Sequence, residues 1–94
     1  MPHVQYNGQV LAQSEATVQE EGNHYFPPDA LVSEHFEPSD HHTVCGWKGR
    51  ASYYHIRVGD SLLENAAWYY PDPKPDALHI KGYVAFYKNK VQVG

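Results

Sequence analysis

The sequence lacks several features that would each point to a particular class of protein. It has one cysteine among 94 residues, which excludes an internal disulfide framework and fits a reducing compartment. No apolar run approaches the roughly 18 residues needed to span a bilayer, and the first residues lack the basic-then-apolar pattern of a secretory signal. These absences predict a cytoplasmic location and no association with a membrane.

Basic residues are also scarce. Lys and Arg number 7 against 11 Asp and Glu, which gives a net charge of −4. Proteins that bind nucleic acid usually neutralise the phosphates with a cluster of positive charge. No such cluster stands out here, so no nucleic-acid partner is predicted. A chain of this length can bury one modest core, and we expect a single domain, residues 1–94.

Glycine and proline are spread through the chain, seven of each, and divide it into short pieces. This spacing favours short strands over helices. Asn7-Gly8 and Gly59-Asp60 each separate two strand-like segments and predict hairpins. Residues 38–40 predict a turn, residues 80–87 the best strand, and residues 27–32 one short helical turn.

The sum of these patterns predicts an all-β fold. We expect seven to nine short strands, mostly antiparallel, with at most one short helical turn. Their arrangement is predicted to be a small folded-over sheet or a partly open barrel.

Four blocks of the sequence resemble the domain of unknown function 427 family. They are EPSDHHTVCGWKG at 37–49, ASYYH at 51–55, ENAAWYYPDP at 64–73 and IKGYVAFY at 80–87. The resemblance implies a compact, single-domain, all-β protein similar to tent-shaped β folds. Members of such folds often carry paired-cysteine zinc knuckles, which Cys45 alone cannot form. The family is sometimes labelled nucleotidyltransferase-like, but the Gly-Ser element and strand carboxylates of that activity are not found here.

Aromatic residues are the outstanding excess, with eight Tyr, two Trp and three Phe. Tyr and Trp combine a large apolar body with one polar tip and therefore line binding sites well. A lysine among such rings can hold an anionic group or lie over a ring face. Alternatively, the tryptophans fill the core of a small domain that has few aliphatic residues. Tyr69 and Tyr87 belong to the aromatic set, and the residues predicted to line a ligand-binding pocket are Trp47, Lys48, Tyr53, Trp68, Tyr70, Lys81 and Tyr83.

The segment 40–49 supports an alternative, enzymatic hypothesis. Cys45 is a candidate nucleophile with His42, or alternatively His41 or His55, as its base, and the charge of Lys48 would favour the thiolate. A zinc site would combine Cys45 and one of His41 or His42 with distant histidines. Zinc needs four such ligands and the local spacing supplies at most two, so neither a metal nor another cofactor is predicted. The distant histidines available to such a site are His24, His35, His55 and His79.

Two functional hypotheses therefore follow from the sequence. The first is a non-enzymatic β-domain that binds a small molecule or a protein through the aromatic and lysine-lined pocket. The second is a small enzyme that uses Cys45 with a histidine, or a His/Cys metal site. The first is favoured because no triad spacing or metal motif stands out. We expect a monomer or a weak homo-oligomer.

Overall fold

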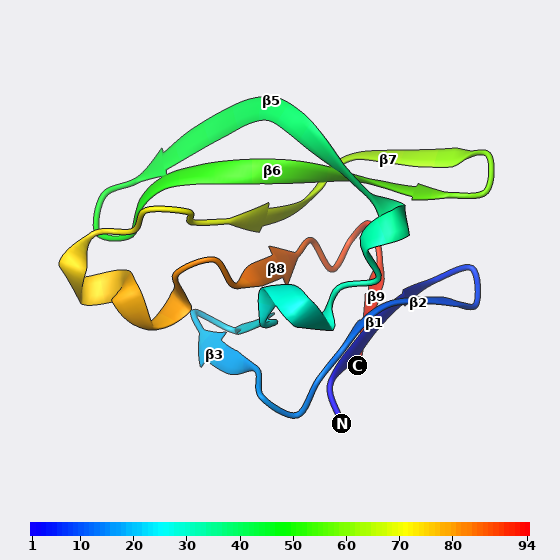
Figure 1. Ribbon diagram of the computed structural model, residues 1–94, viewed down its shortest axis with the longest axis horizontal. Coiled ribbons are helices and arrows are strands. Elements are labelled where there is room, and N and C mark those ends of the chain that lie inside the picture. The colour runs from blue at the N-terminus through cyan, green and yellow to red at the C-terminus, as the bar shows by residue number, and fades with distance from the viewer.

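The computed structural model describes all 94 residues and contains nine short strands in three antiparallel sheets (Figure 1). The prediction of an all-β fold with seven to nine short strands is confirmed. The sheets are open, because none of them closes into a barrel. In the first sheet β1 lies between β2 and β9, in the second β3 pairs with β4, and the third has the order β5-β6-β7-β8. The strands are β1 (His3–Tyr6), β2 (Gln9–Gln13), β3 (Val18–Glu20), β4 (Asn23–Tyr25), β5 (Phe36–Cys45), β6 (Gly49–Val58), β7 (Ser61–Tyr69), β8 (Val84–Phe86) and β9 (Gln92–Val93).

Two of the hairpin turns are those expected from the sequence. Asn7 and Gly8 both have positive φ angles, 49° and 79°, which is the geometry of a type I′ turn between β1 and β2. Gly59, with φ of 56°, begins the turn between β6 and β7. A third turn of the same kind, Glu21-Gly22, joins β3 to β4.

The four-stranded sheet has an apolar cluster on each of its faces. The register places Tyr54, Ala67 and Phe86 opposite one another, whereas Trp68 and Ala85 belong to the neighbouring row. Because successive strand residues point to opposite faces, the two rows contact different clusters. We call these the main core and the second cluster. The main core contains Val4, Leu11, Ala12, Phe26, Ile56, Val58, Ala66, Ala67, Val84, Phe86 and Val91, and the second cluster contains Tyr25, Ala51, Tyr53, Tyr70, Ala77, Ile80 and Ala85.

The segment around residue 40 differs from the prediction. We expected a turn at 38–40, but β5 runs through this region for ten residues. Pro38 is accommodated because β5 is the edge strand of its sheet and the pairing register shifts between Pro38 and His42. A proline at such a position removes no ladder hydrogen bond that the sheet needs.

The predicted strand at 80–87 is present only in its second half. Residues Pro75–Ile80 form the 3-10 helix η3, and Gly82 then takes a φ of 75°, so β8 begins only at Val84. The predicted helical turn at 27–32 is found as η1 (Pro28–Ala30), and η2 (Ser33–His35) is a further short turn. The structure thus has three such turns where one was expected.

The two ends of the chain lie side by side (Figure 1). His3 and Gly94 exchange backbone hydrogen bonds of 2.9 Å in each direction, which extends the pairing of β1 with β9. None of the helical segments has the length and hydrophobicity that crossing a bilayer would require.

Candidate functional site

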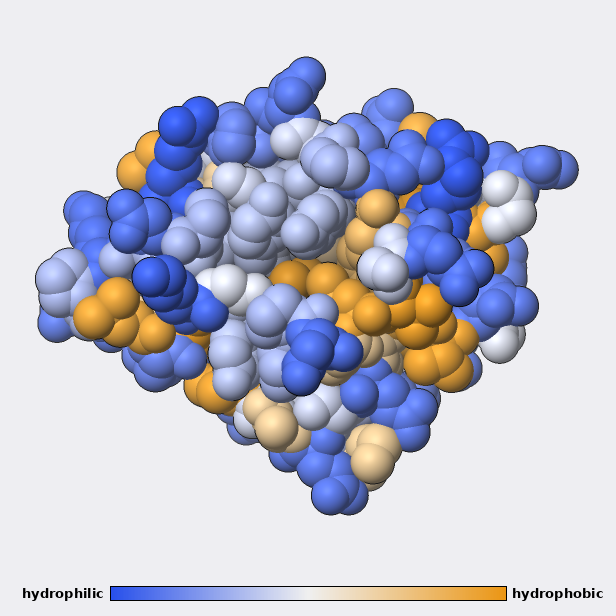
Figure 2. All heavy atoms as spheres, viewed as in Figure 1, coloured by the Kyte–Doolittle hydropathy of each residue, from blue (hydrophilic) through white to orange (hydrophobic).

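Aromatic rings gather on one face of the four-stranded sheet, beside the second cluster. Tyr53 of β6 lies directly opposite Trp68 of β7. Tyr87, immediately after β8, places its ring centroid 4.6 Å from Trp68 and stacks parallel to Tyr53 at 6.4 Å. Figure 2 shows pale, weakly hydrophilic side chains gathered in the middle of the molecule, as expected for tyrosine and tryptophan. We call Tyr53, Trp68 and Tyr87, together with His41 of β5, the aromatic face.

Hydrogen bonds fix the phenols of the aromatic face. The Tyr53 hydroxyl lies 2.9 Å from Thr43 Oγ1 and 3.3 Å from the Tyr87 hydroxyl. The His41 ring covers Tyr53 at a centroid distance of 4.6 Å. Tyr53 is therefore buried, whereas Tyr87 remains 37% exposed and His41 is exposed. The face combines ordered rings with a surface that solvent reaches.

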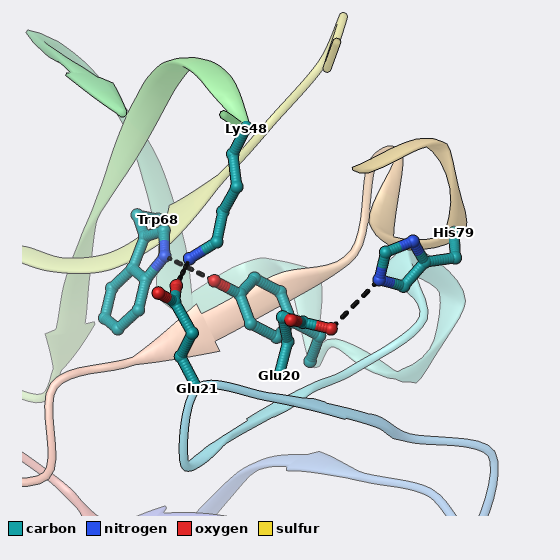
Figure 3. Close-up of polar contacts among 6 residues, drawn as sticks. Glu20, Glu21, Lys48, Trp68 and His79 are labelled. Carbon is teal, nitrogen blue, oxygen red and sulfur yellow. Dashed lines mark hydrogen bonds and ion pairs between the residues drawn. The ribbon is translucent and has the colours of Figure 1, made fainter. Parts of the chain in front are cut away.

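Lys48 is a buried cation beside this face. It extends from the turn between β5 and β6, is 6% exposed, and donates to the carboxylate of Glu21 (Figure 3). Its Nζ lies 5.3 Å from the ring centroid of Trp47, 5.8 Å from that of Tyr70 and 6.0 Å from that of Tyr25. Lysine is rarely buried unless it is paired, so the carboxylate and the rings together replace its water.

Electrostatics at Lys48 act in two directions. Burial lowers the pKa of the Lys48 amine from its ordinary value, and the Glu20 carboxylate opposes that shift. The Glu21 carboxylate, in direct contact with the amine, also favours the charged form.

The β3–β4 hairpin is joined to the rest of the site by three polar contacts. The Lys48–Glu21 ion pair is the first, and the Glu20 carboxylate lies 3.0 Å from His79 Nε2 of η3. The third contact is that of Tyr25 of β4, whose hydroxyl accepts a 3.2 Å hydrogen bond from the indole N–H of Trp68 (Figure 3). These contacts hold the hairpin against the second cluster and over Lys48.

The model of a protein family described as a domain of unknown function (DUF427) matches residues 2–94 of the chain. The chain belongs to the DUF427 family. This finding confirms the resemblance that the four aromatic-rich blocks indicated. No curated protein matches the sequence significantly.

Most of the residues predicted to bind ligand lie together in this DUF427 domain. Tyr53 and Tyr70 belong to the second cluster, and Trp47, Trp68 and Tyr83 pack against it while remaining partly exposed. Trp47 and Tyr70 lie around the Lys48 ammonium, but these residues do not enclose an empty cavity. The cleft of the structure, of about 350 Å³, lies elsewhere, between the Asn7-Gly8 turn and residues 88–92.

Two members of the aromatic and lysine set lie apart from the others. Lys81 is exposed at the end of η3, and its side chain makes no hydrogen bond or ion pair. Tyr69 packs on the opposite side of the sheet, against the main core, where it stacks on Tyr54 at 4.7 Å.

The catalytic candidates are not brought into contact. Cys45 is partly buried against the second cluster and has no hydrogen-bonded histidine. His42 instead places its Nδ1 3.3 Å from the Ala51 carbonyl and 3.2 Å from the Ser52 hydroxyl. No group of three or more His, Cys, Asp or Glu side chains lies close enough together to hold a metal ion. The zinc alternative therefore has no ligand set in this fold.

Three contributors to the site were missed by the sequence analysis. They are Glu21, Tyr25 and Thr43, which contact Lys48, Trp68 and Tyr53. The local sequence of the β3–β4 hairpin does not indicate what the hairpin covers. Glu21 and Lys48 are 27 residues apart in the chain, and only folding shows that they meet.

Replacing Glu21 is expected to reveal how much the ion pair stabilises the fold. We expect Glu21→Gln to lower the free energy of unfolding by about 1 kcal/mol, because it leaves a buried ammonium without its carboxylate while solvent at the half-exposed Glu21 limits the loss. Lys48→Met keeps the apolar stem and removes the charge, so Glu21→Gln should cost almost nothing in that background. Urea unfolding of the four proteins measures the difference.

The control for this cycle is Glu64→Gln. Glu64 is exposed and its carboxylate has no ion-pair partner, so the same chemical change should leave stability unaltered. An equal loss from Glu21→Gln whether Lys48 is present or has been replaced by methionine would show that the two side chains do not stabilise each other.

Proposed function

We propose that this DUF427 domain is a non-enzymatic ligand-binding domain whose aromatic face takes a small molecule with a planar ring. The observation that carries the proposal is the set of ordered, partly exposed rings of Trp68, Tyr87 and His41 around the Tyr53 hydroxyl. Planar ligands stack on such rings at little entropic cost, because the protein side chains are already fixed.

The polar groups of the face define what else the ligand carries. Thr43, Tyr53 and Tyr87 present linked hydroxyls that can donate or accept. Lys48 is buried and paired with Glu21, so its ammonium is not offered to a ligand on the aromatic face. The favoured ligand is therefore a planar ring bearing hydrogen-bonding substituents.

The enzymatic alternative gains no support from a specific contact. It needs a nucleophile joined to a base, and Cys45, the candidate nucleophile, has no histidine hydrogen-bonded to it, while His42 contacts the Ala51 carbonyl and the Ser52 hydroxyl instead. Binding alone is accordingly the function that the geometry supports best.

A titration with small heteroaromatic compounds, such as indole and quinoline derivatives, tests the proposal. Binding should change the fluorescence of Trp68 and shift the amide signals of residues around 41–43, 53, 68 and 87. We expect Tyr87→Leu to weaken binding by about tenfold, because loss of one stacking ring typically costs about 1–3 kcal/mol. Tyr87 lies outside the strands and is partly exposed, so this variant should fold.

Tyr83→Leu is the matched control. Tyr83 is also a partly buried tyrosine beside the second cluster, but its ring contacts no ring of the aromatic face. The Tyr83→Leu variant should bind these compounds with the same affinity as the unaltered protein. Shifts that map away from the aromatic face, or equal weakening by both substitutions, would contradict the proposed site.

A further inference from the structure

The cleft of about 350 Å³ is a feature that the aromatic face does not use. One wall is the Asn7-Gly8 turn between β1 and β2, and the other is the segment 88–92 that leads from β8 into β9. β1 pairs with both β2 and β9, including Gln5 opposite Gln92. One sheet therefore connects the two walls of the cleft.

The charge of the cleft is entirely positive. Lys88 and Lys90 are its only ionisable lining side chains besides the phenol of Tyr6. Neither ammonium pairs with a carboxylate, although the chain has 11 acidic and 7 basic residues. Lys88 Nζ donates to the carbonyl of Gly22 at 2.6 Å and Lys90 Nζ to that of Glu64 at 2.7 Å. Each ammonium has three donors, so two on each lysine remain for a ligand.

Side-chain amides add neutral donors on both walls. Asn7 and Asn89 line opposite sides of the cleft, and neither amide takes part in a hydrogen bond within the protein. Gln92 accepts a 3.2 Å hydrogen bond from Gln5 through its carbonyl oxygen, which leaves its NH₂ group free. The cleft thus offers ammonium and amide N–H donors and no carboxylate.

We propose that this cleft binds a small organic polyanion through its phosphate or carboxylate oxygens. Ammonium and amide N–H groups are the donors that recognise oxyanions. The volume is at the lower end of that of small-molecule sites and is about ten times the volume of a water molecule. The occupant is therefore a compact molecule with two or more anionic oxygens rather than a single small ion.

Titration with inorganic pyrophosphate and with citrate, at constant ionic strength, tests this site. We expect saturable amide shifts confined to residues 5–8 and 88–92, with a dissociation constant of about 1 mM or tighter. Lys88→Gln and Lys90→Gln should each weaken binding by about five- to tenfold, because each removes one charge-assisted contact near the surface. Tighter binding of pyrophosphate assigns the site to phosphates, tighter binding of citrate assigns it to carboxylates, and equal binding supports recognition by charge.

Lys74→Gln is the matched control for the two lysines. Lys74 is also exposed and its Nζ also donates to a backbone carbonyl, that of Gly46 at 2.7 Å, but it lies outside the cleft. Its loss should leave anion binding unchanged. Linear, unsaturable shifts, shifts centred elsewhere, or equal weakening by Lys74→Gln would overturn the proposal. The heteroaromatic titration of Tyr87→Leu is a separate measurement, so failure of one site leaves the other test standing.

Discussion

Phe26→Ala is expected to lower the free energy of unfolding by about 3–5 kcal/mol, the usual loss for a buried phenylalanine. Phe26 is fully buried, and its ring meets that of Phe86 edge-on at 5.8 Å. Its backbone exchanges two 2.8 Å hydrogen bonds with Val84 of β8. The residue therefore connects the end of the β3–β4 hairpin to the four-stranded sheet, and its removal leaves a cavity where these parts join.

Urea unfolding monitored by tryptophan fluorescence measures this loss. The loss expected for Phe26→Ala is a large share of the roughly 5–15 kcal/mol by which whole domains are stable, so that variant could unfold altogether. Phe26→Leu is a milder variant, with an expected loss of about 1 kcal/mol. Leu78→Ala, at a side chain that is 56% exposed, is the control and should change stability by less than about 0.5 kcal/mol. Similar losses at Phe26 and Leu78 would show that Phe26 is not part of a tightly packed core.

The hairpins were predictable because their information is local. Asn7-Gly8 tolerates the positive φ angles of a type I′ turn, and the alternating residues on either side determine which side chains face inward. The pattern at 52–58 places Tyr54, Ile56 and Val58 on one face, and these three residues do contact the main core. Turn chemistry and period-two alternation together account for most of the correct prediction.

Two predictions were wrong, the turn at 38–40 and the first half of the strand at 80–87. Pro38 reads as a turn, but an edge strand with a register shift accepts it. The alternation at 80–87 reads as a strand, but Gly82 adopts a positive φ and the prolines at 71, 73 and 75 lead into η3. The first outcome depends on the position of β5 at the edge of the sheet, and the second on backbone conformations that the alternation of apolar residues does not reveal.

The sequence indicated that several aromatic residues lie together, but not which segment covers them. Tyr53 and Trp68 lie opposite each other because the hairpin pairs β6 with β7. Trp47 and Tyr70 lie beside the Lys48 ammonium, and all four residues belong to the second cluster or pack against it. The ion pair of Lys48 was not predictable. It depends on the β3–β4 hairpin, whose position is set by contacts far apart in the chain.

A steep loss of stability above about pH 10, the ordinary pKa of tyrosine, is the second large effect that the structure predicts. Burial raises the pKa values of Tyr25, Tyr54 and Tyr70 above that ordinary value. The hydrogen bond with Tyr53, together with partial burial, raises the pKa of Tyr87 to about 12. A phenol with a raised pKa in the folded state keeps its proton after the same group has ionised in the unfolded chain.

The sign of the effect follows from this difference in bound protons. The stabilisation is complete below about pH 10, where both states hold the proton, and it is lost as the pH rises through the pKa of the folded state. Each such phenol lowers the free energy of unfolding by about 1.4 kcal/mol per pH unit. Lys48 has the opposite effect on stability. Burial lowers its pKa, so the folded state loses the proton first and the free energy of unfolding gains from Lys48 as the pH rises towards the ordinary lysine pKa.

Between about pH 10 and 12 we therefore expect Tyr70 and Tyr87, the two phenols with the largest shifts, to lower the free energy of unfolding by about 2–3 kcal/mol per pH unit, with solvent reducing the share of the partly exposed Tyr87. Urea unfolding at a series of pH values, with phenolate absorbance followed in parallel, measures the slope. Tyr70→Phe is the diagnostic variant, since Tyr70 is buried and its hydroxyl makes no hydrogen bond within the protein. Its stability at about pH 7 should be almost unchanged and its slope above about pH 10 shallower by about 1.4 kcal/mol per pH unit. An unaltered slope in this variant, or phenols that all titrate near about pH 10 in the folded protein, would mean that the tyrosines are not held neutral by the fold.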